Sequence, residues 1–159
     1  PRFRRFIMGD TDSEVLFFLF VSALEAFGSL TETCDLESVS AALKEALNSA
    51  RSVCDTDGTR ALLTVVATNG ECLVAAHGGK ELYFSTYKTR CSDRGTCPSL
   101  SAACEAPSTS RVNHFIVSSE PLQGENVWEP LAAGDVIGID ATMHVRRTRL
   151  DHVALPVVA

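Results

Sequence analysis

The chain has 159 residues, of which 45% are hydrophobic and 21% charged, and its formal net charge is −6. This length allows one domain with a substantial core, and the composition is ordinary for a soluble globular protein. The acidic balance argues against a general nucleic-acid surface. The longest apolar run, Val15–Val21, is too short for a bilayer span, which takes about 20 residues. We therefore expect neither a nucleic-acid partner nor a membrane segment.

The first predicted helix begins at a short polar stretch and spans Asp12 to Phe27. Thr11 and Glu14 have the spacing of a capping box, in which two side chains satisfy the free N–H groups at a helix start. The run Val15–Val21 has no polar break, so we expect this helix to be covered on several sides. Asp12 then lies in the first turn, near the positive end of the helix. Its carboxylate either helps to cap the helix or holds a ligand cation.

The segment before this helix carries three arginines interleaved with aromatic residues, at positions 2–6. Such a segment can contact nucleic acid. The interpretation we favour is the end of an amphipathic segment that packs on a part of the domain outside residues 1–159.

A second helix is predicted after Asp35, which is a typical N-cap residue. Apolar residues recur at spacings of three and four, at Leu36, Val39, Leu43, Leu47, Ala50 and Val53. This stripe is typical of the core face of a helix lying on a sheet, and a partner-binding face is the alternative.

The rest of the chain is rich in strand signals. Ala61–Thr68 and Glu71–Ala76 flank Asn69-Gly70, which predicts a hairpin with a type I′ turn. With a third strand at Leu82–Tyr87, these segments predict an antiparallel meander. Further strands are predicted at His114–Ser119, Val136–Asp140 and Met143–Leu150, the last of them an arginine-rich edge. Two helices followed by antiparallel strands place the chain in the α+β class.

Residues 88–113 form a long loop with little periodicity that contains Cys91, Cys97 and Cys104. Loops of this length are usually functional or disordered. A metal site, with His114 as a further ligand, and a disulfide within the loop are both alternatives. The cysteine spacing lacks the close pairs that zinc sites usually show, so we expect no metal, and we expect an insertion with reduced thiols in a cytoplasmic protein.

Three stretches resemble one enzyme family in order and spacing. They are Asp10-Thr11-Asp12-Ser13-Glu14, the segment Val65–Ala75 and the segment Phe115–Leu122. Together they resemble the class II glutamine amidotransferases, which are N-terminal-nucleophile hydrolases with an αββα fold. The resemblance runs from about Gly9 to Asp140 and is strongest to the branch of the ergothioneine-pathway amidohydrolase and the fungal glutathione-degrading amidase.

The resemblance implies a role for Asp12, because the corresponding aspartate of the family binds the α-amino group of a glutamine or γ-glutamyl substrate. Thr11 is a neighbour with a weaker claim to substrate binding. The family's nucleophile is an N-terminal Cys, and that Cys, a carboxylate-binding arginine and an Asn-Gly oxyanion hole all lie upstream of the motif that contains Asp12.

We therefore expect residues 1–159 to form a single domain unit, the C-terminal part of an amidotransferase domain, with 88–113 as an insertion. Alone it is expected to be inactive, to contain no catalytic residue and to need no cofactor. Its partners would be the substrate and the missing N-terminal half. The alternatives are a non-catalytic binding or scaffold module, and a metal or redox protein based on Cys91, Cys97 and Cys104.

Overall fold

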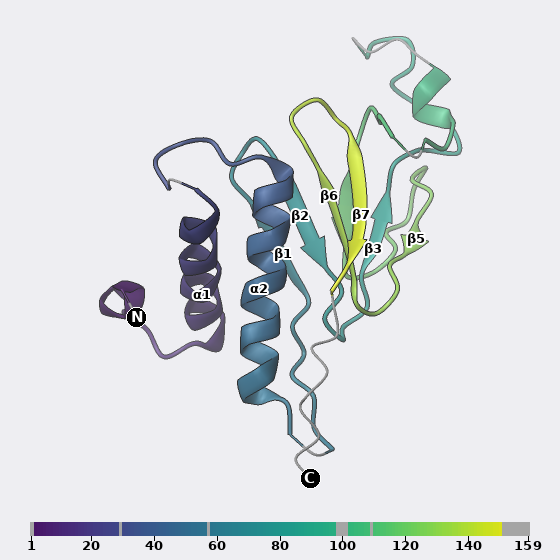
Figure 1. Cartoon of the computed structure of the whole chain (residues 1–159). Helices are drawn as coiled ribbons and strands as arrows, with labels where there is room; N and C mark the ends of the chain where they lie inside the picture. The colour runs from purple at the N-terminus through teal and green to yellow at the C-terminus, as the bar shows by residue number, and fades with distance from the viewer. Residues whose placement is uncertain (1, 29, 57, 98–101, 109, 151–159) are drawn as a thin grey trace. The chain divides into compact units, whose positions relative to one another are not determined.

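A computed structural model describes residues 2–28, 30–56, 58–97, 102–108 and 110–150. The chain divides into two compact units, and the first boundary between them falls after Ala61. The first unit contains the helices η1, α1 and α2, and the second, Leu62–Arg149, contains all the strands. Figure 1 shows these elements. Neither α1 nor α2 combines the length and apolar character that a membrane-spanning helix requires, within the part of the chain described.

The two helices begin where the sequence predicts. α1 spans Asp12–Phe27 with Thr11 as its N-cap, and α2 spans Leu36–Cys54 with Asp35 as its N-cap. The Asp35 carboxylate accepts a hydrogen bond from the Ser38 N–H at 2.7 Å, which satisfies one of the free donors at the helix start. The helices pack side by side (Figure 1), and the short 3₁₀ helix η1, Arg2–Phe6, packs on α1.

The apolar stripe of α2 is buried over its first three turns. The buried residues are Leu36, Val39, Ala42, Leu43, Ala46 and Leu47. The predicted stripe is too long, because Val53 is 81% exposed in the last turn.

The second unit contains two antiparallel sheets. The four-stranded sheet has the order β1-β2-β6-β7 and the three-stranded sheet the order β4-β3-β5. The strands are β1 Val65–Thr68, β2 Leu73–Ala76, β3 Tyr83–Ser85, β4 Ile116–Ser118, β5 Glu129–Pro130, β6 Asp135–Ile139 and β7 Val145–Arg149. The short 3₁₀ helix η2, Ala102–Glu105, lies in the cysteine-containing loop.

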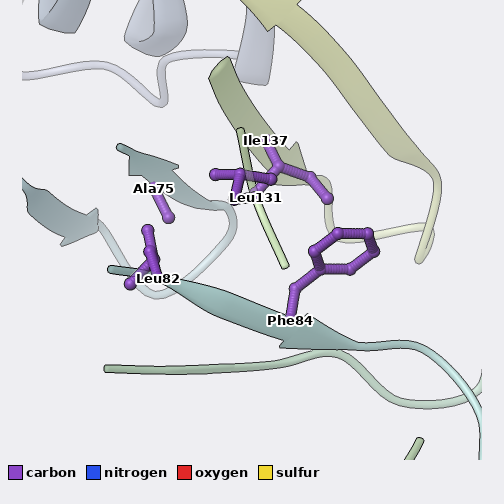
Figure 2. Packing of buried hydrophobic residues seen from close by; sticks show 5 residues of the cluster. All are labelled: Ala75, Leu82, Phe84, Leu131 and Ile137. Atoms are coloured by element: carbon purple, nitrogen blue, oxygen red, sulfur yellow. The ribbon is translucent and has the colours of Figure 1, made fainter. Parts of the chain in front are cut away.

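The two sheets share one hydrophobic core, shown in Figure 2. Ala75 and Ile137 come from the four-stranded sheet, and Phe84 comes from β3 of the other sheet. Leu82 and Leu131, which lie next to the strands, complete the cluster. These are the two β layers that the αββα expectation requires.

The chain's single tryptophan belongs to this unit. The indole N–H of Trp128 donates to the Leu122 carbonyl at 2.9 Å, just before β5. Pro130 occupies an edge strand, where its missing N–H leaves no gap in a ladder.

The predicted meander is wrong, because β3 does not continue the sheet of β1 and β2. β2 pairs instead with β6, a strand some sixty residues further along the chain, which no local pattern reveals. The link after β2 is fixed to the start of β6. His77 N–H donates to the Asp135 carbonyl, and Gly134 N–H donates to the His77 carbonyl, both at 2.9 Å. From there the chain passes to the second sheet.

The hairpin at Asn69-Gly70 exists, but its turn is not type I′. Gly70 has a φ of 90°, whereas Asn69 does not have the positive φ that this turn type needs. The Asn69 side chain accepts hydrogen bonds from the N–H groups of Glu71 and Cys72, at 3.0 and 2.9 Å. This side-chain turn uses residues that the prediction gave to the second strand, so β2 begins only at Leu73.

Candidate functional site

The predicted site lies at the start of α1, and Thr11 has a structural role there. Its hydroxyl oxygen accepts hydrogen bonds from Glu14 N–H at 3.3 Å and from the Ser13 hydroxyl at 3.4 Å. This is the N-cap half of the predicted capping box. Thr11 therefore holds the helix start in place.

Glu14 fixes the loop that leads into the helix. Its two carboxylate oxygens accept hydrogen bonds from Met8 N–H at 3.0 Å and Gly9 N–H at 2.7 Å. In a capping box Glu14 would accept from the N–H of Thr11. Here it accepts instead from the N–H groups two and three residues before Thr11. A Cβ on Gly9 would lie 2.8 Å from a Glu14 carboxylate oxygen, so the absence of a side chain at Gly9 allows this contact.

Asp12 is the exposed carboxylate of this arrangement. One of its oxygens accepts a hydrogen bond from Ser13 N–H at 2.8 Å, and the other accepts none from the described residues. Across the described residues, no lysine, arginine or histidine forms an ion pair with Asp12. The neighbouring backbone is thus fixed by Thr11 and Glu14, while the Asp12 carboxylate remains available to an external cation.

The helix behind this site is less covered than its sequence predicts. No residue of α1 is buried, and Val15, Phe17 and Phe27 are 44%, 54% and 51% exposed. The expectation of a helix covered on several sides is therefore wrong for the residues described. An apolar helix needs more neighbours than α2 and η1 supply.

The segment η1 covers one side of α1. The rings of Phe3 and Phe6 stack on Phe18, with centroids 6.4 and 6.3 Å away, and Arg2 forms an ion pair with Glu25. The aromatic side chains of this segment thus pack on a helix of the described chain, whereas the sequence interpretation expects them to pack on a part of the domain outside residues 1–159.

Comparison with known proteins finds similarity at the level of structure. No family model matches the chain, and no curated protein matches it. A solved glutamine aminotransferase class-II domain protein from Silicibacter pomeroyi superposes with a TM-score of 0.60 at 23% sequence identity. The match covers 93% of this chain but 55% of that one, so the chain spans about half the length of its solved neighbour. The chain has the class II glutamine amidotransferase fold.

Within this fold the cysteine-containing loop shows no metal centre. In the described part of the chain, no three His, Cys, Asp or Glu side chains are placed to hold a metal ion. Cys91, Cys97 and Cys104 are free thiols, so the loop disulfide is absent. Cys104 is buried and its sulfur accepts a weak hydrogen bond from the Asn113 amide at 3.5 Å. Cys104 therefore has a packing role, whereas Cys91 and Cys97 are only partly buried.

The arginine-rich edge of this fold contains an ion cluster that the sequence does not reveal. The Asp135 side chain is 6% exposed and pairs across the strands with Arg147 and Arg149. The Arg147 guanidinium also lies over the Phe84 ring, 5.9 Å from its centroid, and so connects the two sheets. The sequence predicts an arginine-rich edge strand, and in the structure two of its arginines neutralise a buried carboxylate.

A second polar group, His114, lies at the end of the three-stranded sheet. Burial, together with the positive charge of Lys88, lowers the pKa of His114. Its Nε2 atom is buried and finds no hydrogen-bond partner among the described residues, and the same holds for the side-chain oxygen of Asn126. From the sequence, His114 is a candidate metal ligand only, and no local pattern reveals this partly buried environment.

Proposed function

We propose that residues 1–159 form the substrate-holding, C-terminal part of a class II glutamine amidotransferase or γ-glutamyl amide hydrolase. The observation that carries this proposal is the start of α1 in an amidotransferase fold. There a carboxylate without a cationic partner among the described residues is presented on a backbone that neighbouring side chains hold in place. A single exposed carboxylate suits the α-ammonium group of an amino-acid substrate.

The chemistry would be nucleophilic catalysis by an N-terminal Cys that lies outside residues 1–159. Its sulfur attacks the side-chain amide carbonyl, and the nitrogen leaves as ammonia or an amine after taking up a proton. Water then cleaves the γ-glutamyl thioester, which releases glutamate and restores the thiol. The partners of this chain are then the substrate and the remaining part of the same domain. The three free thiols of the loop fit a reducing, cytoplasmic compartment.

The role proposed for Asp12 is tested by Asp12→Asn in the protein as its own cell makes it. The substitution removes the charge from one hydrogen bond to the substrate, a loss of about 1.5–3 kcal/mol. Because this contact is present before and during the reaction, KM should rise by about 10- to 150-fold while kcat stays within about threefold. Glutamate release from glutamine and from γ-glutamyl peptides provides the assay.

Two control variants separate binding from capping. Asp10→Asn makes the same charge change two residues away, and KM should stay within about threefold of the unchanged protein. Thr11→Ala removes the N-cap and should lower the free energy of unfolding by about 1 kcal/mol while KM changes little. An Asp12→Asn protein with normal KM and lowered stability would make Asp12 a second cap and reject its proposed contact with substrate.

The intact mass and N-terminal sequence of the native protein test the other half of the proposal. A product about 100 residues longer than this chain, a size set by ordinary domain dimensions, and starting with Cys would support it. A product without such a Cys would instead favour the alternative, a non-catalytic binding or scaffold module with the same fold.

A further inference from the structure

The two edges of the four-stranded sheet differ in chemistry. β7, at one edge, exposes Arg146, Arg147 and Arg149. β1, at the other edge, belongs to a stretch without a charged residue from Ala61 to Asn69. In this stretch Val66 and Leu62 are 49% and 60% exposed. Native edge strands usually carry charges, bulges or prolines that prevent another strand from adding. β7 has this protection and β1 lacks it.

The register shows which backbone groups of β1 are directed away from its neighbour. Leu63 N–H donates to the Gly78 carbonyl at 2.9 Å, and Asn69 N–H donates to the Cys72 carbonyl at 3.4 Å. Hydrogen-bonding alternates along an antiparallel pair, so Val65 and Ala67, opposite Ala76 and Val74, also face β2.

The N–H groups of Val66 and Thr68 therefore point toward the side of β1 on which no strand pairs within the described part of the chain. They form a donor row that matches the carbonyls of an additional strand. The exposed Val66 side chain requires an apolar side chain opposite it in that strand.

We propose that β1 is an internal strand of the native protein, paired with a strand from the part of the same domain that lies outside residues 1–159. The solved neighbour supports this occupant, because this chain covers only 55% of that chain and the rest of that chain has no counterpart in residues 1–159. The added strand is extended and places no charge next to Val66. The pairing depends on the longer fold and not on the amide chemistry proposed above.

Amide hydrogen exchange of the native protein, resolved to single residues, tests the pairing. Val66 and Thr68 should exchange as slowly as Val65 and Ala67, after correction for intrinsic rates. The matched control is Arg147 on β7. Asp140 N–H donates to the His144 carbonyl and Val145 N–H donates outward to Ser110, so the alternation directs Arg147 N–H to the open side.

The expected result is protection of Val66 and Thr68 at least about tenfold above that of Arg147. If Val66 and Thr68 exchange as fast as Arg147 while Val65 and Ala67 stay protected, β1 is an open edge and the proposal is wrong.

A cross-linking experiment identifies the strand. A photoreactive group at position 66 should link to a peptide of the same molecule outside residues 1–159, in a mixture of light and heavy isotope-labelled protein. Links between light and heavy molecules would assign the edge to a second copy, and links within residues 1–159 would assign it to this chain itself. Either outcome overturns the proposal. A normal KM for Asp12→Asn would reject the substrate contact and leave this test unaffected.

Discussion

Gly78, just after the first hairpin, lies against Leu63, just before it, and substitution of Gly78 by alanine tests this packing. A Cβ at position 78 would lie 2.0 Å from the carbonyl oxygen of Leu63, 2.1 Å from its carbonyl carbon and 2.8 Å from its Cα. Gly78 is also the residue whose carbonyl accepts the Leu63 N–H at 2.9 Å. The new methyl group therefore collides with the peptide that holds the segment before β1 against β2.

The structure sets the size of the effect. The contact at 2.0 Å has to open to at least 3.0 Å, and the obstacle is backbone, which cannot rotate away as a side chain does. Overpacking of this kind costs about 1–3 kcal/mol, and loss of the hydrogen bond adds about 1 kcal/mol. A loss of about 2–4 kcal/mol corresponds to a fall of about 5–15 °C in Tm for a protein of this size.

Thermal unfolding followed by circular dichroism measures this fall, with Gly95→Ala as the matched control. Gly95 has no atom within 4 Å of the position that a Cβ would take, so its Tm should change by no more than about 2 °C. Equal Tm values for the two variants would show that β1 and the turn after β2 are further apart than described, and would refute the argument.

Two further predictions concern buried charge. Asp135→Asn leaves the Arg147 guanidinium without its counter-charge. Because that arginine is 48% exposed, the free energy of unfolding measured with denaturant should fall by about 1–3 kcal/mol. The control Arg146→Gln, on the same strand as Arg147, should lower it by less than about 0.5 kcal/mol, and equal losses would contradict the ion cluster. Burial and the charge of Lys88 lower the pKa of His114 below 6.5, so the unfolded chain binds a proton there more readily than the folded chain does. Protonation of His114 therefore favours unfolding: the folded state keeps its full stability above pH 6.5 and loses part of it as the pH falls toward the folded-state pKa. His114→Gln should therefore show a smaller decrease in Tm than the unchanged protein across this range, and identical pH profiles would contradict the buried environment.

The helices are the part of the fold that the sequence predicts most closely. Thr11 and Asp35 are N-caps as expected, and α1 has the predicted bounds Asp12–Phe27. Capping depends on side chains within three or four residues of one another, so the information is local. The α+β class is likewise confirmed, and β7 is the expected arginine-rich edge strand.

Sheet membership is not local, and here the sequence is insufficient. β2 and β6 pair although the whole second sheet is built from residues that are placed between them in the chain. The two-residue strand β5 carries no strand signal at all, since Glu129 and Pro130 are both poor strand formers. The pairing of Asp135 with Arg147 depends on the same long-range register.

The exposure of α1 has a different origin. Seven consecutive apolar residues indicate that a helix should be buried on several sides, but they do not indicate which elements bury it. The assignment of Asp12 to substrate binding remains a prediction. The structure describes its carboxylate and its surroundings, and the KM measurement tests it.

The position of Trp128 gives this protein an optical property. The two α-helices, which dominate the far-ultraviolet circular dichroism, belong to the first compact unit, and the sole indole belongs to the second. Ellipticity at the helix band and indole fluorescence therefore each report on one unit. Superimposable melting curves from the two signals would mean that both units unfold as one cooperative system, and separated curves would give each unit a stability of its own.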